Sequence, residues 1–134
     1  MKVKGLLIDV KNNPGKVREV EVEEGNLEEL YSILDCRIID IVQRKIGEKV
    51  FDIVCDDEGA LVENPIVSAI GKDCRVMLVG NLFICNHYKE HLTSLSDDDA
   101  AYIVGKTMVA SYAKPTERVF HTNPILTDVG YVRV

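Results

Sequence analysis

An N-terminal β-hairpin is encoded by residues 3–22, VKGLLIDVKNNPGKVREVEV. Residues 3–10 are an apolar run, and further on Val20 and Val22 alternate with glutamates, as in a strand with one face in water. The NNPG segment at residues 12–15 joins the two runs; its proline fixes φ and its glycine accepts a positive φ. We therefore expect two antiparallel strands connected by a tight turn.

Beyond this hairpin, the sequence predicts one short helix and a second pair of strands. Asn26 is followed three residues later by Glu29, a helix-capping pair, and leucines recur at helical spacing over residues 27–34. Residues 36–42 and 50–55 are β-branched runs separated by a polar segment. This is the pattern of two strands that pair as a hairpin.

The second half of the chain carries its most apolar stretch and a second helix signal. After an expected loop at residues 60–72, with room for one helical turn, we expect residues 75–85 to form one central strand, with a bulge or a close backbone approach at Gly80. Ser96 precedes three aspartates and is a helix N-cap. Apolar residues then recur at helical spacing, and the helix is expected to continue until Pro115 ends it.

These elements indicate an α+β fold, because hairpins are interrupted by two helices without a βαβ alternation. The length of 134 residues favours a single domain, mainly an antiparallel sheet with two helices and a β-like C-terminal tail. We expect residues 1–113 to form the core. Residues 114–134 are then a tail that joins subunits or closes over a ligand.

Composition excludes several classes of protein. Hydrophobic residues make up 46% and charged residues 28%, a globular balance. The formal net charge of -6 opposes non-specific nucleic-acid binding, which depends on neutralising phosphates. No apolar run reaches the roughly 18 residues that a membrane span requires, and no secretory leader opens the sequence. We expect a soluble, cytoplasmic protein with no nucleic-acid or membrane partner.

The chain has four cysteines, Cys36, Cys55, Cys74 and Cys85. All four fall in strand-like apolar runs and none belongs to a C-x-x-C pair, so we expect reduced thiols in the core. A structural zinc site at Cys85, His87 and His91 is the alternative. It lacks a fourth ligand nearby, and we therefore expect no metal and no cofactor.

The sequence contains no complete catalytic signature. Gly105-Lys106-Thr107 is similar to the end of a P-loop, but Ala100 stands where that loop requires glycine, and the triplet falls inside the predicted helix. His91-Leu92-Thr93 is a single copy of an H-x-T element that two-histidine phosphoesterases carry twice, one histidine as base and one as acid. We expect no enzyme; a phosphoesterase centred on His91 is the less favoured alternative.

Cationic, aromatic and polar side chains gather near the C-terminal end. They are Lys114, Thr116, Arg118, Phe120, His121, Thr122 and Asn123. Cations can hold a phosphate, an aromatic ring can stack on a base, and amides or hydroxyls can bind a ribose. Asn81 and Phe83, two positions apart, could add a second wall. The alternatives are an ordinary polar tail and, for Phe83, a core position.

The order of these features resembles a family of small proteins from phages and other mobile elements, known only as a domain of unknown function. The resemblance covers about residues 1–110 and rests on VKGLLIDV, NLEELYSIL, CRIIDIV, the D-E-G turn and following asparagine of DDEGALVENPI, VMLVGNLFIC and SLSDDD. Two features depart from the family. The leucine-proline pair before Asn64 is missing, and the segment beyond Pro115 is longer.

In size and general make-up the chain is also similar to phage anti-Thoeris sponges, which hold cyclic ADP-ribose isomers without turnover. This similarity implies a homo-oligomeric counter-defence protein of the host cytoplasm that sequesters a nucleotide-derived signal, a cyclic ADP-ribose isomer or a cyclic oligonucleotide. The ligand-binding residues expected on this hypothesis are Arg118, Phe83, Phe120, His121, Asn123 and Asn81. Arg118 would anchor a phosphate, and one of the phenylalanines would stack. The alternative is a protein-interaction inhibitor that blocks a host effector through its acidic surface.

Overall fold

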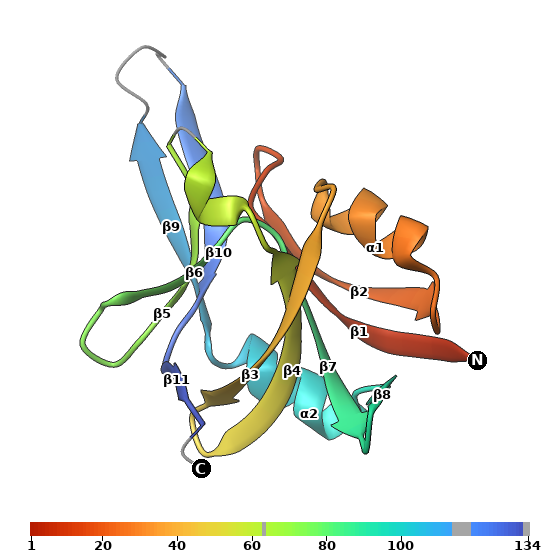
Figure 1. The fold of residues 1–134 in the computed structure, drawn as a ribbon. Coiled ribbons are helices and arrows are strands. Elements are labelled where there is room, and N and C mark those ends of the chain that lie inside the picture. Colours follow the sequence, from red (N-terminus) through yellow and green to blue (C-terminus); the bar gives the residue numbers. More distant parts are fainter. Residues whose placement is uncertain (63, 114–118, 133–134) are drawn as a thin grey trace.

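The computed structural model describes residues 1–62, 64–113 and 119–132. Within these ranges the chain forms eleven strands in two sheets, together with two α-helices (Figure 1). All strand pairs but one are antiparallel. The expected single-domain α+β fold with a mainly antiparallel sheet is confirmed. None of the described helices is long and apolar enough to cross a membrane.

The first hairpin and the first helix lie where the sequence predicts them. β1 (Lys2–Asp9) and β2 (Lys16–Glu23) pair along their whole length. α1 (Leu27–Leu34) begins after Asn26, whose side chain accepts a hydrogen bond from the backbone N–H of Glu29 at 3.3 Å. Both features depend on neighbouring residues alone, which is why pattern and capping suffice to predict them.

The larger sheet has seven strands. Their order is β11-β3-β4-β7-β1-β2, and β8 pairs with the end of β7. The new members are β3 (Ile39–Ile46), β4 (Lys49–Asp56), β7 (Leu82–Tyr88), β8 (His91–Thr93) and β11 (Val129–Tyr131). The predicted second hairpin is confirmed as β3 and β4, and α1 packs on one face of this sheet.

The smaller sheet has the order β6-β5-β10-β9. Its strands are β5 (Val67–Ile70), β6 (Val76–Val79), β9 (Thr107–Ala113) and β10 (Phe120–Leu126). A single parallel bridge between Leu126 and Ala69 joins β10 to β5. A short 3₁₀ turn, η1 (Gly59–Leu61), precedes this sheet, and α2 (Asp97–Val104) precedes β9.

Three predictions about the second half of the chain are wrong. The stretch 75–85 is not one strand, because Gly80 has a φ of 76° and the chain passes there from the smaller sheet to the larger one. The predicted loop at residues 60–72 contains β5. The second helix ends at Val104, and the Gly105-Lys106-Thr107 triplet leads into β9 instead of lying inside the helix. Long-range strand pairing outweighs the local helical periodicity there.

Two apolar clusters form the core, one on each face of the larger sheet. The first joins this sheet to the smaller one and to α2, and includes the fully buried Ile8, Phe51, Ile53, Ile84, Ile103 and Leu126. The second lies beneath α1 and includes the fully buried Leu7, Leu34, Val54 and Phe83. Burial of each such side chain contributes about 1.5–3 kcal/mol. Because Leu126 and Val129 are buried, the C-terminal segment expected as a tail supplies part of the core.

The four cysteines are all free, as expected for reduced thiols. Cys55 and Cys85 are buried and Cys36 is half-buried. Cys74 is exposed in a turn with a φ of 62°, so its predicted core position is wrong. Its apolar neighbours belong to the short strand β6, which begins only after the turn.

Candidate ligand-binding site

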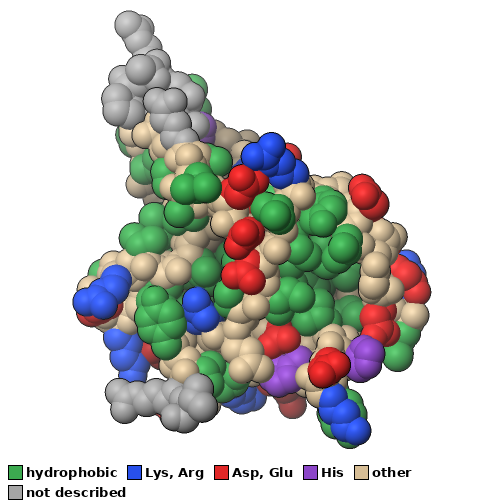
Figure 2. Space-filling view, in the orientation of Figure 1, with side chains coloured by type: hydrophobic (Ala, Val, Ile, Leu, Met, Phe, Trp, Pro, Cys, Tyr) green, Lys and Arg blue, Asp and Glu red, His purple; other side chains and the backbone are tan. Residues whose placement is uncertain are grey.

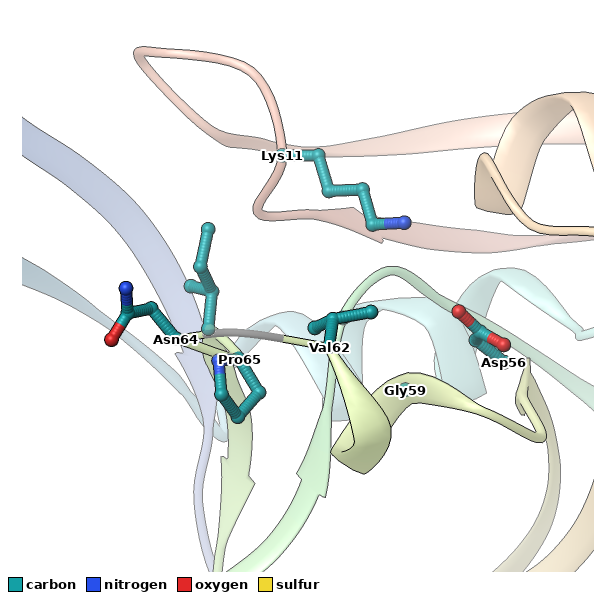
Figure 3. A pocket seen from close by; sticks show the side chains of 8 residues that line it. Lys11, Asp56, Gly59, Val62, Asn64 and Pro65 are labelled. Atoms are coloured by element: carbon teal, nitrogen blue, oxygen red, sulfur yellow. The ribbon is translucent and has the colours of Figure 1, made fainter.

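A pocket of about 100 Å³ opens where the two sheets meet (Figure 3). It is lined by Lys11, Asp56, Gly59, Val62, Asn64, Pro65, Ile66 and Gly80, and we call it the Lys11 pocket. An open hollow of about 350 Å³, the Arg37 hollow, is lined by Cys36, Arg37, Asp56, Glu58, Leu61 and Val62. Since Asp56 and Val62 line both, the two spaces adjoin.

The wall shared by the two spaces is built from the D-E-G turn. The Asp56 carboxylate accepts a hydrogen bond from the Glu58 backbone N–H at 2.9 Å, which closes the turn locally. The next turn is η1, and Gly59 packs against Val79, where an added Cβ would lie 3.3 Å from a methyl group. Gly80 donates its N–H to the Ile66 carbonyl at 2.8 Å and so holds the far wall. The wall is therefore set by one local turn contact and by two contacts between segments that are distant in sequence.

Asn81 positions the turn that carries Lys11. Its Oδ1 accepts hydrogen bonds from the backbone N–H groups of Val10 at 2.9 Å and Lys11 at 3.3 Å. Its Nδ2 donates to the carbonyl of Ile33 at 3.1 Å. Asn81 is buried, and its amide is engaged entirely by the backbone. The sequence predicts Asn81 as a ligand contact, and in the structure its amide binds the backbone beside Lys11.

Lys11 reaches across the mouth of the pocket from the turn after β1 (Figure 3). Its Nζ donates to the Asp35 carbonyl at 2.7 Å and lies 3.7 Å from the Asp35 carboxylate. Asp35 ends α1 in the left-handed conformation, with a φ of 51°. The end of α1 therefore holds the ammonium group at the mouth, and Val62, Pro65 and Ile66 provide an apolar surface below it.

Arg37 and Glu58 form a bidentate ion pair at the rim of the Arg37 hollow. Arg37 Nε lies 2.8 Å and Nη2 3.1 Å from the two carboxylate oxygens of Glu58. The hydrogen bond and charge of Arg37 lower the pKa of Glu58, and Glu58 in turn raises the pKa of Arg37. The Arg37 side chain is largely exposed. The pair fixes a guanidinium group at the surface, beside the shared Asp56 wall.

Of the ligand contacts that the sequence predicts, Asn81 precedes β7, Phe83 lies on β7, and Phe120, His121 and Asn123 lie on β10. Arg118, with Lys114 and Thr116, falls outside the described residues. Phe83 is fully buried beneath α1, the core position given above as its alternative. Phe120, His121 and Asn123 follow one another along β10. The Asn123 amide lies 3.5 Å from the carbonyl of Val67, the residue that follows Ile66 of the Lys11 pocket.

The three residues on β10 differ in their surroundings. Phe120 is 73% exposed. His121 stacks on Tyr112, with ring centroids 5.4 Å apart. Asn123 is buried and donates to the Pro124 carbonyl at 3.1 Å, while its Oδ1 accepts no hydrogen bond from the described residues. On β10, Phe120 is therefore exposed, His121 packs on a neighbouring ring, and the Asn123 amide is buried against the backbone.

A family model described as a domain of unknown function, DUF3846, matches residues 1–108. The chain belongs to this family. Every residue that lines the Lys11 pocket and the Arg37 hollow lies inside the DUF3846 match, whereas β10 and β11 follow it. No curated protein and no solved structure matches the chain.

The histidines of this DUF3846 protein are distributed over separate contacts. His87 Nδ1 lies 3.1 Å from Asp52, and its Nε2 lies 3.1 Å from the Gln43 amide nitrogen. His91 Nδ1 lies 3.0 Å from Glu24. Among residues 1–62, 64–113 and 119–132, no three His, Cys, Asp or Glu side chains are arranged to hold a metal ion. Cys85, the third residue of the zinc site considered as the alternative, is buried.

Sequence reasoning missed Lys11 and Arg37 as site residues. Lys11 stands beside the NNPG turn and Arg37 beside the strand β3, and neither belongs to a recognised motif. The D-E-G turn with its following Asn64 was the available signal, because aspartate, glycine, asparagine and proline favour turns. A search for site residues around that turn would have predicted two residues of the pocket lining, Asp56 and Asn64.

Proposed function

We propose that this DUF3846 protein binds a small anionic molecule, of the nucleotide-derived class, in the Lys11 pocket and the adjoining Arg37 hollow, and does not convert it. The observation that carries the proposal is the adjacency of the two spaces with a cation at the mouth of each. Ligand sites usually occupy about 300–1,000 Å³ and combine apolar walls with a few placed polar groups. The hollow has this size, and the pocket below Lys11 admits a ring or a phosphate-sized group.

The two cations retain donors for an anion. An ammonium group has three N–H donors, and the described contacts of Lys11 Nζ all go to Asp35. A guanidinium group has five, and Arg37 uses two of them on Glu58. An incoming phosphate can therefore add to these ion pairs without displacing them. Val62, Pro65 and Ile66 offer the apolar surface on which a base can lie.

In its narrower form, the proposal is that of a phage counter-defence protein that sequesters a cyclic ADP-ribose isomer or a cyclic oligonucleotide in the host cytoplasm, as a homo-oligomer. The similarity in size and make-up to anti-Thoeris sponges supports this form. Arg118, Phe120, His121 and Asn123 stay predicted contacts of that ligand, and they are tested apart from Lys11 and Arg37.

Isothermal titration calorimetry with cyclic ADP-ribose isomers and cyclic dinucleotides tests the proposal. We expect binding to the unmodified protein, and a loss of affinity of about tenfold or more in Lys11→Met and in Arg37→Met, because a charge-assisted hydrogen bond contributes about 1.5–3 kcal/mol. Lys2→Met is the matched control, since Lys2 is an exposed lysine at the start of β1. No heat with any of these ligands, or an equal loss in the control, would contradict the proposal. Variants of Phe120 and Arg118 tested in parallel show whether the C-terminal segment takes part.

Mass spectrometry of the ligand recovered after incubation distinguishes binding from turnover. The proposal expects the ligand unchanged. An altered ligand would favour the phosphoesterase centred on His91 instead. In the structure His91 contacts Glu24, and His121 stacks on Tyr112 in the other sheet.

A second candidate function is inhibition of a host effector by direct protein contact. Figure 2 shows apolar side chains gathered beside α1 and β3, with acidic side chains at their border. Leu27 on α1, Ile41 on β3 and Ile38 between these elements are each close to half exposed. Recovery of a stoichiometric protein partner from host lysate, with no small molecule released on heating, would favour this candidate over ligand binding.

A further inference from the structure

We infer that this chain forms a symmetric dimer in which β9 pairs antiparallel with β9 of a second copy. The inference concerns a different part of the molecule from the Lys11 pocket and does not depend on any ligand. It begins from a comparison of the strands that end the two sheets.

Exposed sheet edges invite pairing with other chains, and proteins protect them with charges, short strands or irregularities. In the described part of the chain, five strands pair with one neighbour alone, and four of them have such protection. One of the four is β8, which has three residues. Five of the eight residues of β2, KVREVEVE, are charged. β11 has three residues, and β6 has four residues with shifts in its register to β5. β9, TMVASYA, has seven residues without a charge or a proline.

The backbone of β9 is oriented for this pairing. The Thr122 carbonyl accepts a hydrogen bond from Gly15 N–H at 2.7 Å, so the backbone polar groups of Thr122 point away from β9. Thr122 lies opposite Ser111, which therefore directs its own N–H and C=O outward. Pro124, which has no N–H, lies opposite Val109 and fits the same alternation. The outward-facing residues of β9 are then Thr107, Val109, Ser111 and Ala113.

The side chains around this edge are apolar and exposed. Val109 and Phe120 are each 73% exposed, and Met108 is 51% exposed. Figure 1 shows β9 at one edge of the smaller sheet. The chain has a net charge of -6, so two copies repel each other over most surfaces. The uncharged β9 edge brings no like charges together, which favours a second copy as its occupant.

The pattern of outward groups specifies a register. Thr107, Val109, Ser111 and Ala113 are distributed symmetrically about Ala110. A two-fold axis at Ala110 places Val109 opposite Ser111 of the second copy and Thr107 opposite its Ala113. Both pairs then exchange two hydrogen bonds, and the two Ala110 residues face each other with Cα atoms about 4.5 Å apart. The smaller sheets of the two copies become one continuous sheet.

Sedimentation of the purified full-length protein tests for the dimer. We expect a dimer at about 100 µM and a monomer for Val109→Lys, because a lysine at the centre of a sheet edge opposes pairing. Val76→Lys is the matched control: Val76 is 54% exposed on β6, at the opposite edge of the same sheet. A monomeric unmodified protein, a dimeric Val109→Lys variant or dissociation of the control to the same extent would overturn the inference.

Disulfide formation tests the register, with Cys74→Ser as the background because Cys74 is the exposed native thiol. Ala110→Cys is expected to cross-link two copies upon oxidation, since a Cα separation of about 4.5 Å lies within the range that disulfides span. Ser111→Cys is the comparison, and it is expected to remain uncross-linked because Ser111 faces Val109 in this register. Cross-linking of Ser111→Cys without Ala110→Cys, or of neither, would overturn the proposed pairing.

Discussion

Burial changes the pKa of a thiol and therefore its reactivity, and the cysteines of this chain differ in burial. Burial, with a smaller effect from Asp52, raises the pKa of Cys85 to about 12. Burial raises the pKa of Cys55 to about 11, with a smaller contribution from Asp40. Cys74 is exposed in its turn. Since the thiolate is the reactive form, these sites should differ strongly in reactivity although all four thiols are free.

The folded protein should lose stability at high pH through Cys85. Its pKa is raised from 9.0 to about 12, so above pH 9 the unfolded thiol loses its proton while the folded thiol keeps it. The stabilisation from the neutral thiol is fully present below pH 9 and decreases as the pH rises further. From this group alone, the free energy of unfolding should fall by about 2 kcal/mol between pH 8 and pH 10.5.

Urea unfolding of the unmodified protein and of Cys85→Ala at both pH values measures this effect. The variant is less stable at pH 8 because it leaves a cavity, but its pH dependence should be smaller by the amount that Cys85 contributes. Equal pH dependence in the two proteins would show that the thiol does not titrate as described.

Elements are joined through a few side chains, and α2 is the clearest case. The Tyr102 hydroxyl accepts a hydrogen bond from Glu48 N–H at 3.0 Å, in the turn between β3 and β4. Lys49 of the same hairpin contacts Asp99 at 3.0 Å, and this contact lowers the pKa of Asp99. Gly47 lies beside Tyr102 in the left-handed conformation, with a φ of 61°. Tyr102 of α2 can therefore pack against this turn only because position 47 has no side chain.

Gly47→Ala should destabilise the protein more than Gly25→Ala. Gly25 also has a positive φ, 80°, but nothing lies within 4 Å of the position of an added Cβ. Gly25→Ala then reports the backbone cost alone, about 1–2 kcal/mol, and the alanine at position 47 adds a clash with the Tyr102 hydroxyl. Thermal unfolding of the two variants gives the comparison. Equal losses would mean that α2 yields to the new methyl group without cost.

The whole molecule depends on strands that are distant in sequence, which limits what the sequence alone can predict. The caps at Asn26 and Ser96 and the first hairpin are local, and the sequence predicts them correctly. The break at Gly80 and the strand β9 depend on partners elsewhere in the chain, so periodicity misleads there. The candidate site joins Lys11 to Asp56, two residues that come together only in the folded chain. Phe83 has suitable chemistry for a ligand contact, but the packing of α1 encloses it.

A chain that ends at Ala113 should not fold, although residues 1–113 include the whole DUF3846 match. It lacks β10, the inner neighbour of β9, and the buried Leu126 and Val129. Loss of these two side chains alone removes about 3–6 kcal/mol of burial, a large part of the stability of a small domain. Circular dichroism should show no cooperative unfolding for this chain, whereas a chain ending at Val132 should unfold like the complete protein. A cooperative transition in the shorter chain would contradict this role for β10.

The Lys11 pocket takes its walls from both layers of the molecule. Asp56 ends β4 of the larger sheet and Lys11 lies in the turn after β1 of the same sheet. Ile66 leads into the smaller sheet, and at Gly80 the chain passes from the smaller sheet to the larger one. A ligand bound in the Lys11 pocket would contact residues from both sheets at once. Its binding should slow amide hydrogen exchange in β4 and β5 together. Occupancy of one small cavity would then reduce local opening in both sheets.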